Sequence, residues 1–151
     1  MDKNQGIKII ATNRKAHFNY FLSDFTECGI VLKGTEIKSL RVHSCSIGDS
    51  YVIIRNDEAE ILNMHINPYE QGNIFNQDPL RSRKLLLHKK EIAWFADKAK
   101  RSGFSIVPTR VYFRKGKCKV EIALAKGKKD YDKRETIKQR DIERDLRKGE
   151  Y

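Results

Sequence analysis

The side chains best suited to acid–base chemistry in this sequence are Glu36, His43 and Asp49, which follow one another closely along the chain. Histidine and carboxylate groups could act as general base and general acid in a basic nuclease. Nothing in their spacing requires that role, and the sequence has no phosphate-binding Gly-Lys-Ser/Thr loop, Gly-x-Ser-x-Gly elbow or His-Glu-x-x-His motif. We therefore expect no enzyme, no catalytic residue, no metal and no cofactor, with a nuclease as the remaining enzymatic alternative.

Basic residues form a more specific pattern. They cluster at positions 13–15, at 81–84 and along 110–119. Spread over one surface, they would contact phosphates. Such contacts give salt-dependent affinity but little discrimination between nucleotide sequences. We expect few exposed aromatic side chains on the strands, so a folded RNA is favoured over single-stranded RNA as the partner.

The overall composition agrees with a polyanionic partner. The 151 residues include 31 Lys and Arg against 20 Asp and Glu, which gives a net charge of +11. Apolar runs are only a few residues long, so we expect no membrane association, and the first residues do not resemble a secretory signal. Cys28, Cys45 and Cys118 are odd in number and widely spaced, which favours free thiols in a cytoplasmic protein.

Most of the chain has the pattern of short strands. Runs rich in Ile, Val and Tyr predict strands at 7–12, 20–22, 29–32, 51–55, 60–67, 106–114 and 117–125. The last two alternate apolar and polar residues around Lys115-Gly116, which is typical of a β-hairpin. Helical spacing predicts helices at 35–42 and 89–101. The pattern indicates a mainly β protein, a small antiparallel barrel.

The end of the chain differs in composition. Residues 126–151 carry 10 basic and 7 acidic side chains and few large apolar ones. Such a segment cannot bury enough surface to offset the entropy of ordering it. We therefore expect two parts, an RNA-binding barrel over 1–125 and a basic tail over 126–151 that is disordered when free and helical on a partner.

Seven strings, in order from about residue 9 to residue 146, closely resemble the small protein B family, the SsrA-binding proteins. Each string alone is weak, but seven in register are specific. They are Asn13-Arg14-Lys15-Ala16, Gly34-Thr35-Glu36-Ile37-Lys38-Ser39-Leu40-Arg41, Asp49-Ser50-Tyr51-Val52, Pro68-Tyr69-Glu70-Gln71-Gly72-Asn73, Asp78-Pro79, Arg83-Lys84-Leu85-Leu86-Leu87 and Ala125-Lys126-Gly127-Lys128-Lys129 followed by Asp132-Lys133-Arg134.

The resemblance implies a six-stranded antiparallel barrel related to the OB fold, with two or three short helices. It implies binding to the tRNA-like domain of transfer-messenger RNA and rescue, by trans-translation, of ribosomes stalled on mRNA without a stop codon. Elongation factor Tu with GTP would take part in delivery, and the tail would fold as a helix in the vacant mRNA channel of the 70S ribosome. The alternative left open is a general structured-RNA-binding or ribosome-binding OB-fold protein.

The resemblance also assigns roles to individual residues. Asn13 would bond base or sugar edges, Glu27 would accept from a base amino group or hold neighbouring basic residues in place, and Leu86 would touch an exposed base. Lys119 would pair with phosphate, and the weaker phosphate partners would be Arg14, Lys15 and Lys84. Tyr131 stands where many relatives carry His and could still stack on a base. The residues expected to meet the ribosomal decoding site are Lys126, Gly127, Lys128, Lys129, Tyr131, Asp132, Lys133 and Arg134.

Overall fold

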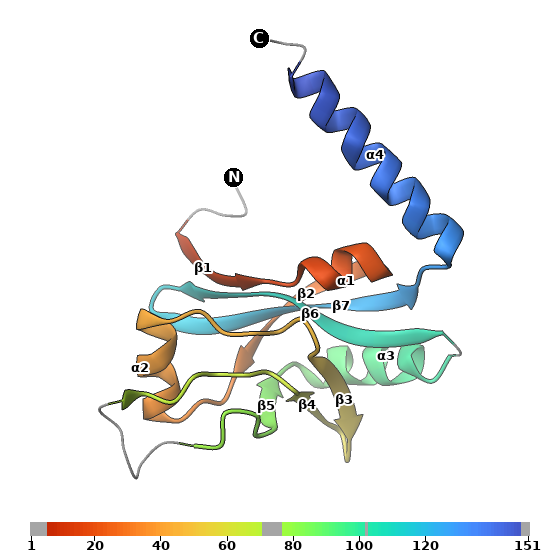
Figure 1. The fold of residues 1–151 in the computed structure, drawn as a ribbon. Helices are drawn as coiled ribbons and strands as arrows, with labels where there is room; N and C mark the ends of the chain where they lie inside the picture. The colour runs from red at the N-terminus through yellow and green to blue at the C-terminus, as the bar shows by residue number, and fades with distance from the viewer. Residues whose placement is uncertain (1–5, 71–76, 102, 149–151) are drawn as a thin grey trace.

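The structure is a computed structural model that describes residues 6–70, 77–101 and 103–148. Positions 71–73 of the family strings and 149–151 of the expected tail lie outside the described residues. Within them the chain forms seven strands and four helices (Figure 1). In chain order these are β1 (Ile7–Thr12), α1 (Arg14–Asn19), β2 (Tyr20–Ile30), α2 (Gly34–Val42), β3 (Tyr51–Arg55), β4 (Glu58–Leu62), β5 (Arg83–Leu86), α3 (Lys89–Ala99), β6 (Phe104–Arg114), β7 (Lys117–Gly127) and α4 (Asp130–Lys148).

Six of the strands pair in a closed circuit. The order is β6-β3-β4-β5-β2-β7, every pairing is antiparallel, and β7 pairs again with β6. The seventh strand, β1, lies along the second half of β6. This arrangement agrees with the mainly β, six-stranded antiparallel barrel expected from the sequence.

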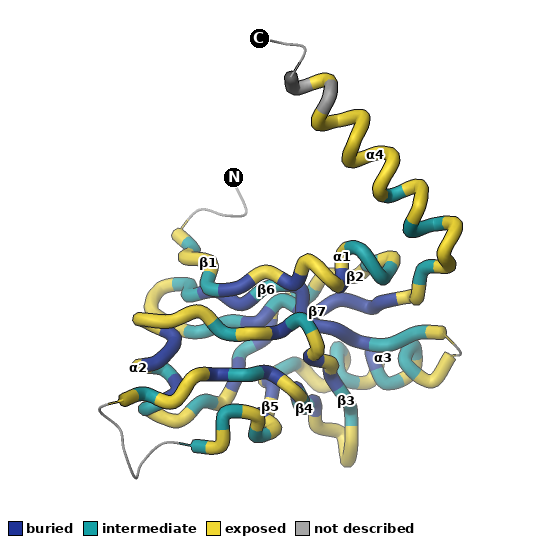
Figure 2. The backbone as a smooth tube through the Cα atoms, viewed as in Figure 1, coloured by how far each residue is buried: buried dark blue, intermediate teal, exposed yellow. Residues whose placement is uncertain are grey.

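The two hairpins form where the turn chemistry predicts them. Lys115 and Gly116 both have positive φ, at 51° and 76°, between β6 and β7. Asn56 and Asp57 have φ of 54° and 58° between β3 and β4. Two consecutive residues with positive φ make the tight turn whose twist matches that of the flanking strands. Beyond the turn, alternate residues such as Val120 point into the barrel, which Figure 2 shows as its dark interior.

Four elements differ from the sequence-based expectation. A strand was predicted at 60–67, but β4 ends before Asn63, whose φ is 60°. The structure has one long strand β2 where two short ones were predicted, because a bulge between Ser23 and Thr26, with Asp24 at a φ of 57°, interrupts the alternation. Helix α1 was not predicted, since its six residues are too few for a helical period to show. Strand β5 was not predicted either, because Arg83 occupies a core-facing position that composition marks as polar.

The tail begins later than the expected boundary and is helical in this structure. Strand β7 continues to Gly127, two residues past the expected boundary, and residues 130–148 form helix α4, which projects from the barrel (Figures 1 and 2). Residues 128–148 contain neither Gly nor Pro and are rich in good helix formers. Asp130 and Asp132 lie in the first turn, where the helix dipole favours negative charge. Local propensity therefore produces a helix that the count of apolar side chains did not predict.

One charged cluster lies inside the fold. The side chains of Glu36 on α2 and Arg83 on β5 are 4% and 0% exposed, with 2.5 Å between Oε2 and Nε. Arg83 also donates to the carbonyl of Met64 at 2.6 Å and to that of Pro79 at 3.1 Å. Glu36 accepts a second guanidinium, that of Arg81. The cluster thus ties α2, β5 and the chain before β5 together.

Replacing one partner of this pair tests its role. We expect Glu36→Gln to lower the free energy of unfolding by about 3–5 kcal/mol, because it leaves a buried guanidinium without its counter-charge. The half-exposed pair of Glu60 with Arg55 is the control, and Glu60→Gln should change stability by less than about 1 kcal/mol. Urea denaturation of both variants measures the difference, and equal losses would contradict the assigned role.

The same pair predicts a pH dependence. Burial opposes ionisation of Glu36, but hydrogen bonds from Arg81, the Lys33 amide and Arg83 outweigh it and hold the pKa of this carboxyl below its ordinary 4.5. A lowered folded-state pKa means that the ionised group stabilises the fold above the unfolded-state pKa and stops doing so as the pH falls through the folded-state pKa. The stability gap between the wild type and Glu36→Gln should therefore be full well above pH 4.5 and shrink below it.

Candidate nucleic-acid interface

Four of the seven residues expected to contact RNA line one hollow of about 580 Å³. The hollow is bounded by β2, β5, β7, the β3–β4 turn and the start of α3. Glu27 comes from β2, Lys84 and Leu86 from β5, and Lys119 from β7. We call it the β2–β5–β7 groove. The fold thus brings together side chains that are far apart in the sequence.

Strand register explains why these side chains meet. Gly29 on β2 lies opposite Leu86 on one side and opposite Lys119 on the other. A Cβ on Gly29 would lie 3.3 Å from the Cβ and from the Cδ1 of Leu86, closer than most real contacts of that kind. The absence of a side chain at this position therefore allows Leu86 to lie against the β2 backbone. Leu86 remains 53% exposed there and offers an apolar surface.

The groove carries both signs of charge. Lys84 pairs with Glu58 at 3.2 Å, and Lys119 lines the same hollow as Glu27, opposite Gly29, which is two residues further along β2. Lysines attract phosphates wherever these lie, whereas a carboxylate accepts only from a donor such as a base amino group. The remaining ionisable groups in the lining are Asp57, His88, Lys89, Glu91 and the thiol of Cys28, whose pKa burial raises to about 12.

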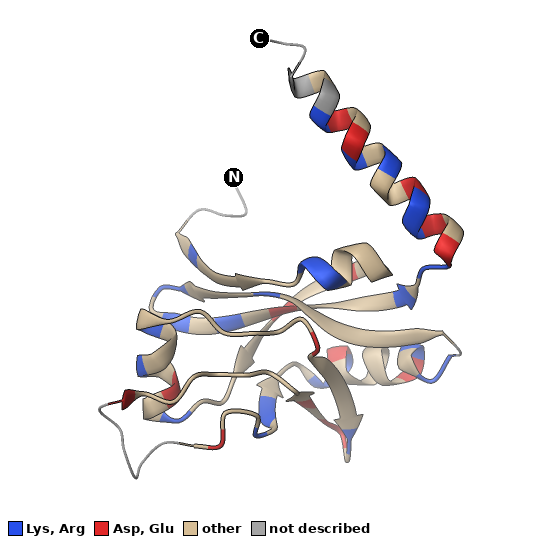
Figure 3. Cartoon of the chain, viewed as in Figure 1, with Lys and Arg blue, Asp and Glu red and all other residues tan. Residues whose placement is uncertain are grey.

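The other three candidates lie elsewhere on the barrel. Asn13, Arg14 and Lys15 stand at the start of α1, which lies along the top of the barrel in Figure 1, whereas β5 is a strand in its lower part. Arg14 and Lys15 are exposed, and Lys15 pairs with Asp49 at 3.4 Å. Figure 3 shows this basic start of α1 well apart from the basic residues of β5. The basic residues therefore form two surfaces, one at the β2–β5–β7 groove and one at α1.

Asn13 has a structural role that the sequence did not suggest. Its side chain is buried and accepts from the Ala16 amide at 3.0 Å, which caps α1. Its amide group donates to the carbonyls of Ile47 at 3.2 Å and Pro108 at 2.8 Å. In the structure this side chain bonds the protein itself, and its contact with RNA stays a prediction. Asn13 positions Arg14 and Lys15.

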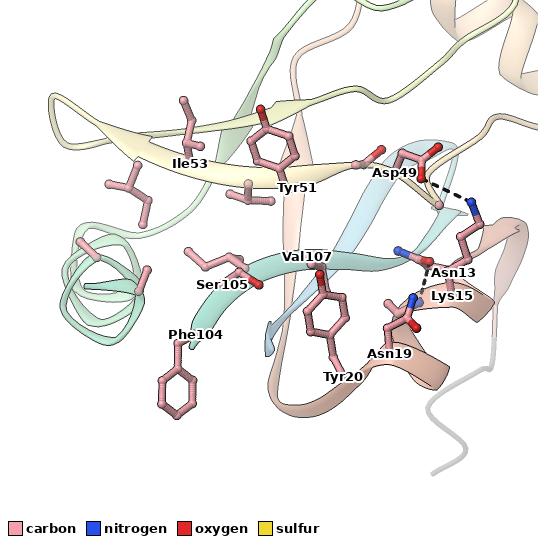
Figure 4. Close-up of a pocket in the computed structure, with 18 of the residues that line it drawn as sticks. Asn13, Lys15, Asn19, Tyr20, Asp49, Tyr51, Ile53, Phe104, Ser105 and Val107 are labelled. Atoms are coloured by element: carbon pink, nitrogen blue, oxygen red, sulfur yellow. Dashed lines mark hydrogen bonds and ion pairs between the residues drawn. The ribbon is translucent and has the colours of Figure 1, made fainter. Parts of the chain in front are cut away.

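A second, larger hollow of about 970 Å³ adjoins α1, between β3, α3 and the start of β6 (Figure 4). Tyr20, Tyr51 and Phe104 line it together with Lys15. Tyr51 is 42% exposed, and Phe21 and Phe25 on β2 are about half exposed. On the described strands the exposed aromatic side chains are thus these three.

The tail residues begin at the end of β7. Lys128 joins the tail to the barrel, since its amide donates to the Asn19 carbonyl at 2.9 Å and its Nζ lies 2.9 Å from the Thr136 hydroxyl. The Asp132 carboxylate accepts from the Lys129 amide at 3.2 Å, which closes the first turn of α4. Tyr131 is 69% exposed. The residues of the expected decoding-site set that are exposed or half-buried are Lys126, Gly127, Lys128, Lys129, Tyr131, Asp132, Lys133 and Arg134.

Comparison with known proteins gives the family. The family model of the SmpB protein matches residues 10–150. This chain belongs to the SmpB family. The SsrA-binding protein of Malacoplasma penetrans is 55% identical, with 94% of this chain and 97% of the relative covered. That of Caldicellulosiruptor bescii is 52% identical, with 97% and 93% covered, and that of Staphylococcus aureus is 51% identical, with 97% and 95% covered.

A solved structure points to the same family. A chain of "tmRNA-SmpB: a journey to the center of the bacterial ribosome" is 40% identical to this one, with a TM-score of 0.69. The match covers 82% of this SmpB-family chain and 87% of that chain. It includes most of the barrel by length, so the similarity extends beyond short motifs.

The residues considered for a nuclease are not brought together. Glu36 is buried in its ion pairs, Asp49 pairs with Lys15, and His43 is exposed just after α2. Within the described part of this SmpB-family chain, no three His, Cys, Asp or Glu residues are grouped so that they could hold a metal ion. No helix in that part is long and apolar enough to cross a membrane. The three cysteines are free thiols, of which Cys28 is buried and the other two are half-buried.

The buried position of Asn13 leads to a prediction. We expect Asn13→Ala to lower the free energy of unfolding by roughly 2–4 kcal/mol, because it removes a helix cap and two buried hydrogen bonds to backbone carbonyls. Asn19→Ala, at the other end of the same helix, is the control and should change stability by less than about 1 kcal/mol. Urea denaturation tests both, and an Asn13→Ala variant as stable as the wild type would contradict the structural role.

Proposed function

We propose that this chain binds the tRNA-like domain of transfer-messenger RNA in the β2–β5–β7 groove. It brings that RNA, in a complex with elongation factor Tu and GTP, to cytoplasmic ribosomes stalled on mRNA without a stop codon, and trans-translation rescues them. The observation that carries the proposal is the convergence of Glu27, Lys84, Leu86 and Lys119 on one hollow of a chain that belongs to the SmpB family. The role is one of binding and placement, without catalysis.

Each groove residue has a chemistry suited to a folded RNA. Leu86 provides an apolar surface on which an exposed base can rest. Lys119 and Lys84 contact phosphates, and Glu27 accepts from a base amino group. Arg14 and Lys15 on α1 offer a second set of phosphate contacts, so a bulky RNA can touch the barrel in two places. An unstructured RNA could neutralise the lysines but would not hold a base against Leu86.

The tail is suited to a separate task on the ribosome. In the proposed complex, the residues from Lys126 to Arg134 contact ribosomal RNA at the decoding site, and α4 enters the vacant mRNA channel. Supporting this, α4 projects from the barrel with basic and acidic side chains exposed along it (Figure 3). Tyr131 offers an exposed ring that can stack on a base.

A titration against a transcript of the tRNA-like domain tests the proposal, with an unstructured RNA of equal length as competitor. We expect Leu86→Ala to weaken binding about tenfold, which corresponds to losing roughly 1–2 kcal/mol of apolar contact. Leu80 is the matched control, since it is 52% exposed against 53% for Leu86 and lies outside the groove. Leu80→Ala should bind as the wild type does.

The competitor separates this proposal from the alternative of a general RNA-binding protein. Binding that survives the competitor supports recognition of the folded RNA. Binding that the unstructured RNA displaces equally well, and that falls steeply with salt, would contradict the proposal and favour non-specific phosphate contacts.

The division between barrel and tail gives another prediction. We expect a chain that ends at Lys128 to keep its affinity for the tRNA-like domain within about threefold, since the groove is intact and only phosphate contacts are lost. The same chain should fail to release ribosomes from an mRNA without a stop codon. Ending at Lys128 preserves β7, which a cut at 125 would shorten.

A chain that ends at Lys148 is the control, because it keeps all of α4. It should bind RNA and rescue ribosomes as the full chain does. Rescue by the chain that ends at Lys128 would show that α4 is not needed, and a large loss of RNA affinity would show that the tail belongs to the RNA site.

A further inference from the structure

A tyrosine that does not line the groove forms a hydrogen bond with Glu27. The hydroxyl of Tyr112 on β6 donates to Oε1 of Glu27 at 2.5 Å. Tyr112 is 1% exposed, whereas the side chain of Glu27 is 36% exposed. A buried, fixed donor thus supports an exposed carboxylate at the edge of the groove.

The ring of Tyr112 is itself fixed by two arginines. Arg110 and Arg114 lie two residues before and after it, on the same face of β6. Their guanidinium carbons are 4.9 Å and 5.8 Å from the centre of the ring. Arg110 is anchored in turn by its ion pair with Glu121 at 3.1 Å. The tyrosine therefore has little freedom to turn its hydroxyl away from Glu27.

The Tyr112 hydroxyl and the Arg114 guanidinium both approach the same oxygen of Glu27, the first as a hydrogen-bond donor and the second as an ion pair. Arg114 Nε lies 3.3 Å from Oε1, the atom that also accepts from Tyr112. The other carboxylate oxygen, Oε2, takes part in neither of these two contacts. Burial raises the pKa of Tyr112 well above its ordinary value, and the bond to Glu27 raises it further, so the hydroxyl stays protonated and remains a donor.

Such support matters because phosphates repel a carboxylate. A glutamate on an exposed strand has several rotamers, and near an RNA backbone it would turn away into solvent. Fixing Oε1 removes that freedom before the RNA arrives, so the entropy of ordering Glu27 is not lost on binding.

We propose that Tyr112 is a positioning residue, which holds Glu27 by Oε1 so that Oε2 accepts from an amino group of a base in the bound RNA. Tyr112 does not touch the RNA, since its side chain is buried. This inference rests on the proposed function of the groove and extends it by a residue that supports the site from the neighbouring strand.

The test begins with Tyr112→Phe, which removes the hydroxyl and keeps the ring. We expect the affinity for the tRNA-like domain to fall about five- to tenfold, as for the loss of one fixed hydrogen bond to a charged group. The affinity for unstructured RNA and the salt dependence should not change, because the lysines are untouched. A general structural defect would weaken both kinds of binding.

The same hairpin provides a matched control. Thr109 is 1% exposed, and its hydroxyl donates to the Glu121 carboxylate at 2.7 Å, outside the groove lining. Thr109→Val therefore removes an equally buried bond from a hydroxyl to a carboxylate. It should lower the melting temperature about as much as Tyr112→Phe does and leave the affinity for the tRNA-like domain unchanged.

A double-mutant cycle with Glu27→Ala decides whether Tyr112 acts through Glu27. We expect Tyr112→Phe to weaken binding in the wild type and to have no further effect in Glu27→Ala. The inference would be overturned if Tyr112→Phe lowered the affinity equally in the wild type and in Glu27→Ala. It would also be overturned if Tyr112→Phe left the affinity of the wild type unchanged while Glu27→Ala bound weakly. Either result would leave the proposed function standing.

Two further outcomes are informative. If the wild type shows no preference for the tRNA-like domain, the proposed function fails, and the inference fails with it. If Tyr112→Phe does not fold, Glu27→Asp replaces it, because the shorter side chain keeps the charge but draws the carboxylate away from the Tyr112 hydroxyl. Glu27→Asp should bind as weakly as Glu27→Ala, and binding equal to the wild type would overturn the inference.

Discussion

Glu36 and Arg83 form an ion pair inside the protein, where either charge alone would be strongly destabilising. The guanidinium of Arg83 also donates hydrogen bonds from its other two nitrogens to the carbonyls of Met64 and Pro79. These contacts fix the position of β5. Because side chains alternate along a strand, Arg83 and Leu85 point inward, while Lys84 and Leu86 point outward into the groove. One buried charge pair thereby sets which face of β5 meets the RNA in the proposed complex.

Strand β2 joins the two halves of that surface. It pairs with β5 through only two residues but with β7 along most of its length. Gly29 is the position at which both neighbours meet, and it has no side chain to separate them. The groove therefore needs a short, fixed strand on one side, a long hairpin on the other and a glycine between them. No one of these elements forms it alone.

The sequence predicted the parts of the fold that depend on local chemistry. The bounds of β1 and β3 match the prediction, and the β6–β7 hairpin follows from alternation and the turn at Lys115-Gly116. What could not be predicted depends on distant partners. Arg83 looks like a surface residue until Glu36 is placed beside it. Asn13 has the same polar atoms whether it faces RNA or caps α1, and only the folded chain reveals its bonds to the carbonyls of Ile47 and Pro108.

The candidate site shows the same limit. Family motifs supplied Glu27, Leu86 and Lys119, and the structure brought them together, but Tyr112 was only one position in an alternating strand. Its link to Glu27 crosses from β6 to β2, which no spacing along the chain reveals.

The proposed recognition gains its selectivity from carboxylates placed in a basic surface. The net charge of +11 attracts any RNA, so attraction alone cannot distinguish a folded partner from an unstructured one. Glu27, Glu58 and Asp57 in the groove repel phosphates that enter without an amino group to offset them. An RNA that presents a base to Leu86 and an amino group to Glu27 meets no such penalty. A rigidly held Glu27 cannot move away from the phosphates of an unstructured RNA. The difference in affinity between the folded and the unstructured RNA therefore becomes larger.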